Sequence, residues 1–380
     1  MSQNSRMRYL KTYIEKDLND KMVLLGGPRQ AGKTTLAQQI LKQRPGLYLN
    51  WDADEDRDII LNKKWEQSEQ LLIFDELHKY KRWKNWIKGT FDKERTHHQF
   101  LITGSARLDI YKQGGDSLFG RYNYWRLHPF TLCELPSGIS KEEGFRRLLE
   151  LGGFPEPFLK NNSIEAKRWR RSRYDLVIKQ DLRDLESVQD ISKLELFFQM
   201  LRERVGGMVV LSNLANDLEI APKTAKKWLL LLERMYLLFI VKPYSSKMNR
   251  ALVKPPKVYF YDNADVKGDI GARFENLVAC HLLKQIHFLE DHYGDSYELH
   301  YLRDKEKREV DFLILKEGKV EQLIETKWND SAIPTSLLYY QRKLSPKRAS
   351  LVVGTPLKSY DKEGISVRYA IPFLSEFKYV

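Results

Sequence analysis

Residues 27–35 read Gly27-Pro28-Arg29-Gln30-Ala31-Gly32-Lys33-Thr34-Thr35, and no other segment constrains the architecture of this chain as strongly. They fit the pattern GxxxxGK[ST], a glycine-rich loop whose backbone N–H groups surround phosphates. The apolar run 22–25 before the loop predicts a buried strand, and residues 35–41 after it predict a helix with Leu36 and Ile40 on one side. Because strand, loop and helix follow in the order that the motif needs, the whole stretch is a candidate phosphate-binding site.

The chemistry of such a loop assigns a role to its last residues. Glycines let the backbone curl inward, and the helix adds its positive N-terminal end, so a multiply charged anion is held by main-chain groups. Lys33 would reach the β- and γ-phosphates, and the Thr34 hydroxyl would be a ligand of Mg²⁺. The alternative is a glycine-rich turn that carries Lys-Thr by chance.

A second apolar run, residues 70–74, ends in Asp75-Glu76. An acidic pair at the end of a buried strand supplies the other half of a nucleotide site. Asp75 would hold the hydrated Mg²⁺, and Glu76 would act as the catalytic residue that orients and polarises the attacking water. The alternative is an apolar strand that ends in acidic residues by chance. The dense acidic run 52–58 is expected to be a solvated loop.

Two further segments offer groups for the γ-phosphate. Residues 99–105 form a strand pattern that ends in small polar residues, so Thr103 or Ser105 is a candidate sensor, with a simple strand-to-loop turn as the alternative. Arg121 precedes the strand pattern 122–127 and is a candidate catalytic cation, acting within its own chain or on a neighbour. A surface salt bridge explains Arg121 as well.

Composition limits the class of protein. A chain of 380 residues is long enough for two or three domains, and no apolar run reaches membrane length. The polar N-terminus and only two cysteines, Cys133 and Cys280, indicate the cytoplasm. The net charge of +13 suits a polyanion such as DNA, although basic residues scattered over a solvated surface give the same total.

These segments resemble the additional-strand P-loop ATPases of the AAA type. More closely, they resemble a prokaryotic AAA family whose members carry a C-terminal domain of unknown function with a restriction-endonuclease-like PD-(D/E)xK fold. The residues that carry the resemblance are Gly27–Thr35, Phe74-Asp75-Glu76, Ile102-Thr103-Gly104-Ser105, Gly120-Arg121 and Gly152-Gly153-Phe154-Pro155-Glu156.

The resemblance covers nearly the whole chain and implies an α/β fold, a P-loop NTPase parallel sheet with helices on both faces. Alternating strand and helix patterns independently favour a parallel sheet. The resemblance also implies ATP as the nucleotide. We expect an ATPase domain over residues 1–135, a helical and winged-helix region over 136–250, and a small α/β nuclease-like domain over 251–380.

The middle region contains two basic features. Lys167-Arg168-Trp169-Arg170-Arg171 either grips a phosphate backbone or is a solvated helix face. Residues 211–244 have the pattern of a helix-turn-helix with a wing, in which Pro222 opens the second helix. That helix would turn Lys223, Lys226 and Lys227 outward, as a DNA-reading helix does, or serve as an internal scaffold that contacts no base.

The C-terminal region contains a candidate nuclease site. Residues 309–315 and 323–327 would pair as a hairpin through Lys316-Glu317-Gly318-Lys319, which brings Asp311 beside Glu325 and turns Glu325 and Lys327 to one face. This is the D…ExK arrangement of restriction-endonuclease-like domains, except that Val310 stands where a proline often precedes the aspartate. Asp311, Glu325 and Glu275 would hold Mg²⁺, and Lys327 would position a water. Exposed hairpin charges are the alternative.

Three functions follow as hypotheses. The first is an Mg²⁺-dependent ATPase whose nucleotide cycle drives a DNA-binding or DNA-processing C-terminal module, with an oligomer as an open question. The second is a nucleotide-dependent switch or interaction protein with slow turnover and no nuclease activity. The third adds metal-dependent DNA cleavage to the first.

Overall fold

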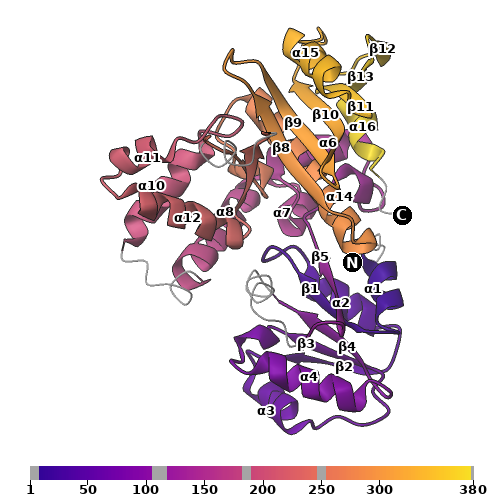
Figure 1. The fold of residues 1–380 in the computed structure, drawn as a ribbon. Coiled ribbons are helices and arrows are strands. Elements are labelled where there is room, and N and C mark those ends of the chain that lie inside the picture. Colours follow the sequence, from indigo (N-terminus) through magenta and orange to yellow (C-terminus); the bar gives the residue numbers. More distant parts are fainter. Residues whose placement is uncertain (1–7, 105–117, 182–189, 246–253, 378–380) are drawn as a thin grey trace. The chain divides into compact units, whose positions relative to one another are not determined.

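The computed structural model describes residues 8–104, 118–181, 190–245 and 254–377 (Figure 1). The chain divides into two compact units. The first comprises residues 1–129 with 234–236, and the second comprises residues 130–233 with 237–380. No helix in the described residues is both long and apolar enough to span a lipid bilayer.

The first unit is built on a five-stranded parallel sheet with strand order β2-β3-β4-β1-β5. Its strands are β1 (Met22–Gly26), β2 (Gly46–Asn50), β3 (Leu71–Asp75), β4 (Gln99–Thr103) and β5 (Tyr122–Arg126). The three central strands β1, β3 and β4 are apolar along almost their whole length, because a parallel sheet is covered on both sides.

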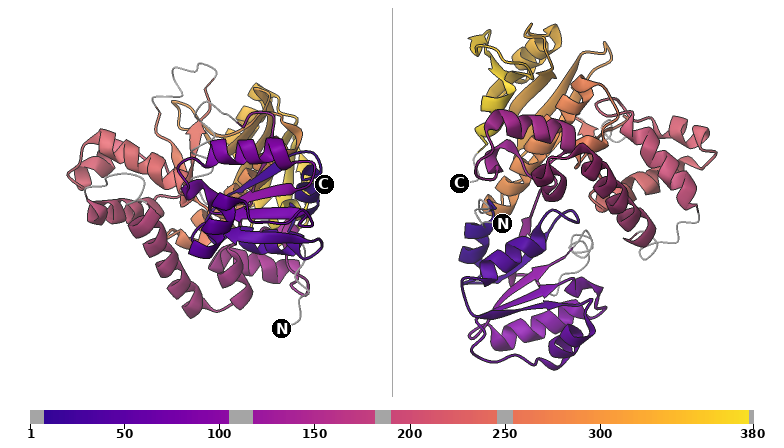
Figure 2. Two further views of the ribbon diagram at one scale, coloured as in Figure 1. Left: turned by 90° about the horizontal axis from the view of Figure 1, so that it is seen from below. Right: turned by 180° about the vertical axis from the view of Figure 1, so that it is seen from behind.

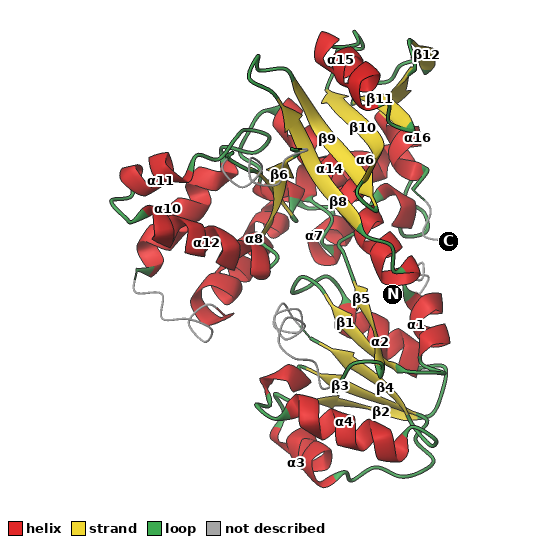
Figure 3. Ribbon diagram, viewed as in Figure 1, coloured by secondary structure: helices red, strands yellow, loops and turns green. Residues whose placement is uncertain are grey.

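Helices cover both faces of this sheet, as the resemblance implies (Figure 3). They are α1 (Lys11–Asp17), α2 (Lys33–Leu41), α3 (Asp54–Asn62), the 3₁₀ turn η1 (Leu77–Lys79) and α4 (Trp83–Glu94). On one face, Leu24, Phe74 and Phe100 pack with Trp83 and Ile87 of α4. On the other, α2 packs against β3 and β4, and α1 packs against β1.

The acidic run 52–58 is not a loop. It begins α3, and its acids Asp54, Glu55 and Asp56 occupy the first turn of that helix. Negative side chains are favourable there because the N-terminus of a helix carries partial positive charge. The expectation of a solvated loop was therefore wrong, since it counted like charges without considering a helix start.

The second unit contains an eight-stranded mixed sheet with strand order β12-β13-β11-β10-β9-β8-β6-β7. Its strands are β6 (Leu238–Pro243), β7 (Lys257–Phe260), β8 (Tyr297–Arg303), β9 (Glu309–Lys316), β10 (Lys319–Lys327), β11 (Arg348–Val353), β12 (Tyr360–Lys362) and β13 (Ile365–Tyr369). The predicted hairpin is confirmed, because β9 and β10 pair antiparallel around Glu317-Gly318, and both of these residues have positive φ.

Several helices of the unit pack against this second sheet (Figure 2). The long helix α14 packs against β7, β8 and β10, and α15 packs against β9 and β10. The helical elements of the unit are η3 (Leu132–Glu134), α6 (Lys141–Leu151), α7 (Pro155–Lys160), α8 (Ser163–Asp175), the π-helical turn η4 (Leu176–Asp181), α10 (Ile191–Arg202), α11 (Leu211–Asp217), α12 (Pro222–Arg234), η5 (Asn263–Asp265), α14 (Ile270–Tyr293), α15 (Thr335–Leu344) and α16 (Ala370–Ser375). The expected division at residues 135 and 250 stays a prediction.

Candidate functional site

The glycine-rich loop joins β1 to α2. Gly27 has φ 129°, and a Cβ atom there would lie 2.4 Å from the carbonyl oxygen of Leu127. Gly32 has φ 95° and is the N-cap of α2. Both positions therefore need glycine, the first for close approach to the neighbouring backbone and the second for its left-handed conformation.

Lys33 is buried and folds back over the loop. Its Nζ donates to the carbonyl oxygens of Gly27 at 3.0 Å and Pro28 at 2.7 Å. The loop therefore keeps the ammonium group at its own backbone, beside the N–H groups that the motif directs toward phosphate.

A buried arginine outside the motif supports the loop. Arg8 donates to the carbonyl oxygen of Ala31 at 2.7 Å and to that of His128, so it ties the loop to the segment after β5. Sequence reasoning missed this residue, because it lies in a polar leading segment and both of its partners are main-chain atoms distant in sequence.

The carboxylate of Asp75, at the end of β3, accepts hydrogen bonds from three hydroxyl groups. It accepts from Thr34 Oγ1 at 2.8 Å, from Tyr48 Oη at 2.5 Å and from Thr103 Oγ1. The parallel register places Asn50, Asp75 and Thr103 side by side at the carboxyl edge of the sheet. Burial, with the nearby Asp75 carboxylate, raises the pKa of Tyr48. Tyr48 was not expected from the sequence, since a tyrosine within a strand carries no special signal.

The oxygen atoms of Thr34 and Asp75 suit Mg²⁺. The threonine hydroxyl and the aspartate carboxylate are hard ligands, and they lie within hydrogen-bond distance of each other at the phosphate loop. Magnesium keeps several waters and takes few protein ligands when it is bound with phosphates, so two such groups are a sufficient set. We conclude that these residues fit the ion.

Glu76 follows Asp75 in a left-handed conformation, with φ 56°. Its carboxylate lies 3.4 Å from Lys79 Nζ and 3.6 Å from His78 Nε2. Burial raises the pKa of Glu76, and the positive charges of Lys79 and Arg29 oppose that shift. The glutamate is therefore near the nucleotide loop but engaged by its own local turn.

The other residues that the sequence offered as contacts for the γ-phosphate do not lie together. Thr103 lies at Asp75, and Ser105 lies outside the described residues. Arg121 pairs with Asp92, at 2.7 Å from Nε and 3.0 Å from a terminal nitrogen. It precedes β5 and therefore sits at the amino edge of the sheet, a strand length of roughly 16 Å from the loop at the carboxyl edge. Its guanidinium does not reach the loop of its own chain.

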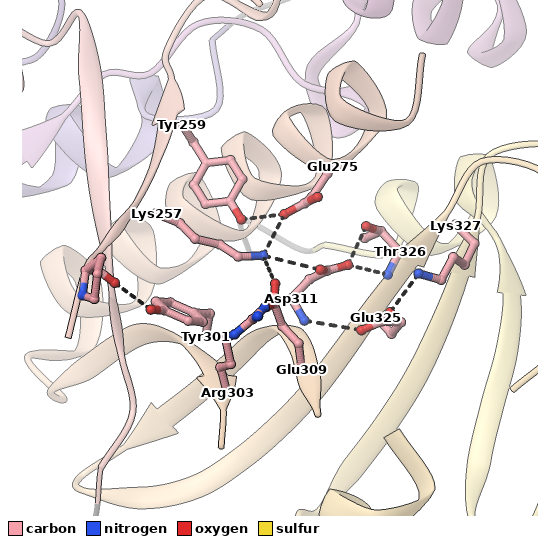
Figure 4. Close-up of polar contacts among 11 residues, drawn as sticks. Lys257, Tyr259, Glu275, Tyr301, Arg303, Glu309, Asp311, Glu325, Thr326 and Lys327 are labelled. Carbon is pink, nitrogen blue, oxygen red and sulfur yellow. Dashed lines mark hydrogen bonds and ion pairs between the residues drawn. The ribbon is translucent and has the colours of Figure 1, made fainter. Parts of the chain in front are cut away.

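The hairpin brings Asp311 and Glu325 together in the second unit (Figure 4). The backbone N–H of Asp311 donates to Glu325 at 3.3 Å, and Asp311 accepts from the Thr326 backbone N–H at 2.9 Å and hydroxyl at 2.7 Å. Lys327 lies 3.0 Å from Glu325, so both side chains share a face as predicted. Burial and the Asp311 charge raise the pKa of Glu325 to about 8.

A lysine that was not predicted lies among these carboxylates. Lys257 Nζ is 2.7 Å from Glu309, 3.3 Å from Glu275 and 3.5 Å from Asp311, and its side chain is 1% exposed. Burial alone would lower the pKa of Lys257, but the three carboxylates outweigh it and raise this pKa. Tyr259 also donates to Glu275, at 2.6 Å. The lysine therefore stays charged in a buried site.

This arrangement does not fit a divalent metal ion. The ammonium group of Lys257 lies between Glu275 and Asp311, two of the residues expected to hold Mg²⁺, and supplies the positive charge that an ion would bring (Figure 4). Within the described ranges, no three His, Cys, Asp or Glu side chains are grouped to hold a metal. We derive no metal-dependent step at this cluster.

The helical region follows its predicted pattern. α12 begins at Pro222, with Ala225, Leu229 and Leu232 buried, while Lys223, Lys226 and Lys227 are exposed. β6 and β7 pair antiparallel after it. The assignment of these elements as a winged helix, and its contact with DNA, stay predictions.

Three family models match the chain. Residues 19–135 match the model described as AAA domain. Residues 142–264 match Domain of unknown function (DUF8612), and residues 270–374 match Domain of unknown function (DUF4143). The match over residues 19–135 supports an AAA-type P-loop domain and covers the loop, Asp75 and Glu76.

Two relatives match part of the chain at low identity. Over 243 residues the chain is 26% identical to uncharacterized protein Rv2008c of Mycobacterium tuberculosis, which covers 63% of this chain and 54% of that protein. Uncharacterized protein MJ1637 of Methanocaldococcus jannaschii is 25% identical over 300 residues, covering 65% of this chain and 62% of that one. The chain thus spans between half and two thirds of these relatives.

Two solved structures show a distant likeness to the chain. The Holliday junction branch migration motor RuvB of Thermotoga maritima has a TM-score of 0.30 and 20% identity, covering 60% of this chain and 88% of that chain. The Orc1 protein of Aeropyrum pernix in complex with DNA has a TM-score of 0.33 and 10% identity, covering 73% and 98%. TM-scores this low do not support an inference about function from either structure.

Proposed function

We propose that the first unit binds Mg·ATP and hydrolyses it. The observation that carries this proposal is the hydrogen bond of 2.8 Å between Thr34 and Asp75, which joins the end of the phosphate loop to the end of β3. A loop with the required glycines, followed by two oxygen ligands in contact, is the constellation that triphosphate hydrolysis needs. The AAA domain match over residues 19–135 supports adenine as the base.

Each residue then has a specific task. Lys33 exchanges its loop carbonyl partners for phosphate oxygens, and the backbone N–H groups of the loop hold the remaining phosphate charge. Thr34 and Asp75 would hold Mg²⁺, which neutralises negative charge on the phosphates when it is bound. Glu76 orients the attacking water, and Thr103 keeps Asp75 in position through its hydroxyl.

Phosphate release by the purified full chain tests this function. Wild-type protein should release phosphate from ATP only with Mg²⁺, and Lys33→Ala should abolish release. Glu76→Gln should bind ATP without turnover, because it keeps the shape of the side chain and removes the base. A fully active Lys33→Ala variant would refute the proposal.

A slow nucleotide-dependent switch is the second candidate function. The observation that favours it is the engagement of Glu76 with Lys79 at 3.4 Å, since this carboxylate must leave the lysine before it can orient water. Lys79→Met separates the two functions. It should increase turnover several-fold if release of Glu76 limits a switch, and leave turnover unchanged if the ATPase is already fast.

We propose further that the second unit binds nucleic acid without cleaving it. Support comes from the exposed lysines of α12 and from the ammonium group that occupies the carboxylate cluster. Incubation with single-stranded, duplex and branched DNA in Mg²⁺ or Mn²⁺ should give binding and no nicking. Nicking that Asp311→Ala removes would restore the nuclease hypothesis.

A further inference from the structure

One face of α8 is basic. Lys167, Arg170, Arg171 and Tyr174 follow each other at spacings of three, four and seven residues from the first, so they lie on one side of the helix. Trp169 points away from this face into the core, where its ring lies 5.2 Å from that of Phe154. The cluster predicted from the sequence is thus divided into a core tryptophan and a surface that the basic residues share.

This face of α8 is one wall of a depression with a volume of about 710 Å³. The other walls come from α10, which supplies Phe198 and Arg202, from the loop after η5, which supplies Lys267, and from the first turn of α14, which supplies Arg273. Six lysine and arginine side chains line it, against the two acids Glu203 and Asp265. We call it the basic depression.

Both acids of the depression already have a cationic partner. Asp265 accepts from Arg202 Nε through its carbonyl oxygen at 2.6 Å, and its carboxylate lies 3.5 Å from the same guanidinium. Glu203 lies 3.7 Å from Lys267. In the part of the chain that the structure describes, Lys167, Arg171 and Arg273 therefore have no acidic partner. Three cations from two separate elements converge with their charge uncompensated.

Buried polar atoms in the same place also lack partners. Among the described residues, the Tyr174 hydroxyl and the Nε atom of Arg273 are shielded from solvent and make no hydrogen bond. A shielded donor without a partner costs free energy, so such atoms indicate a ligand that accepts from them. A basic face that served only solubility would leave its donors in water. This observation is independent of the charge count.

We propose that the basic depression binds consecutive phosphates of a nucleic-acid backbone. The proposal rests on the proposed binding of nucleic acid by this unit and assigns the site. Lys167, Arg171 and Arg273 neutralise the phosphates, and the Tyr174 hydroxyl donates to a phosphate oxygen. The tilted rings of Tyr174 and Phe198, 5.1 Å apart, provide an apolar floor for the sugar. A chain of phosphates matches cations spread over α8 and α14 better than one compact anion does.

Salt-dependent DNA binding by the full chain tests this proposal. Fluorescence anisotropy of a labelled duplex and its single strand would be measured between about 50 and 200 mM KCl. Lys167→Ala and Arg171→Ala should each weaken duplex binding by up to about tenfold and reduce the slope of log Kd against log salt by about 0.9. Arg171→Lys should retain the slope of log Kd against log salt. Tyr174→Phe should weaken DNA binding but leave this slope unchanged.

The controls separate the possible failures. Lys358→Ala removes an exposed lysine that does not line the depression, so it should bind DNA like the wild type. Circular dichroism and phosphate release from ATP should be unchanged in every variant. Depression variants that bind with wild-type affinity and slope would overturn the assignment of this site alone. A wild type that binds no DNA would overturn the proposed nucleic-acid function and the site with it. Inorganic triphosphate that saturates the depression while DNA does not would show a small-anion site instead.

Discussion

The ammonium nitrogen of Lys257 lies 3.5 Å from a carboxylate oxygen of Asp311, and the side chain of this lysine, the first residue of β7, is buried. An internal cation thus stands in a carboxylate cluster whose spacing in sequence resembles a metal-dependent nuclease. Lys257 supplies a positive charge to this cluster from within the fold, which supports the proposed role in binding rather than cleavage.

Replacing this lysine should create a metal site. Lys257→Met leaves Glu275, Glu309 and Asp311 without their shared cation, so unfolding free energy should fall by about 3–5 kcal/mol. Mn²⁺ should then restore stability and bind with measurable heat in calorimetry, whereas wild type should give none. Lys358→Met is the matched control, and Asp311→Asn in the Lys257→Met background should remove the new binding. Equal Mn²⁺ affinity in wild type and variant would contradict the interpretation.

Tyr48 should matter for turnover. Tyr48→Phe removes one of the hydroxyl donors to Asp75, and a hydrogen bond to a charged acceptor contributes about 1.5–3 kcal/mol. We expect phosphate release at saturating ATP to fall about tenfold or more, with little change in KM. Tyr293→Phe changes an exposed tyrosine and serves as control. Unchanged turnover in Tyr48→Phe would show that Asp75 does not need this donor.

Arg8 should act as a positioning residue for the loop. Arg8→Met removes the donors to the Ala31 and His128 carbonyl groups, so we expect Kd for Mg·ATP to rise about tenfold while kcat changes little. Arg8→Lys keeps the charge but not the paired donors and should be intermediate. A large loss of kcat with unchanged Kd would instead place Arg8 in the chemical step.

Stability of the second unit should decrease in mild acid through His281. Its Nε2 accepts from the Leu132 N–H at 3.1 Å, and Nδ1 faces the Leu277 carbonyl at 2.8 Å, so the ring is neutral. Burial lowers the pKa of His281 to about 3, and the charges of Lys284 and Lys141 act in the same direction.

Because the unfolded histidine titrates near 6.5, the unfolded state binds more protons between these two values. The contribution of the neutral His281 ring to the stability of the folded state is therefore complete above about pH 6.5 and is lost as pH falls toward 3. At pH 5 the free-energy difference between wild type and His281→Gln in urea unfolding should shrink by about 2 kcal/mol relative to pH 7.5. A difference that is constant with pH would contradict this effect.

The parts of the fold that the sequence predicted are those with local signals. The loop at Gly27 and Gly32, the strand that ends at Asp75 and the hairpin turn at Gly318 each depend on neighbouring residues, and local patterns identify such features. Arg8 and Tyr48 act through partners far away in sequence. A single sequence therefore contains nothing that marks them.

Lys257 shows the same limit for a whole site. The D…ExK spacing predicted which carboxylates come together, and Asp311, Glu325 and Glu275 do lie in one cluster. The cation between them comes from β7, and a lysine in a short strand gives no hint of burial. The sequence left the role of Arg121 open, between a catalytic cation and a surface salt bridge, for a related reason. Its position before β5 does not reveal that it lies at the amino edge of the sheet until the parallel pairing of β5 with β1 is known.

The most direct test is calorimetric titration of the purified full chain with Mg·ATP, beside the Lys33→Ala variant. Binding between β1 and α2 predicts a saturable heat with one site in the wild type, and a severe loss in the variant. No heat and no saturation in the wild type, or an identical isotherm for Lys33→Ala, would contradict a triphosphate held by this loop.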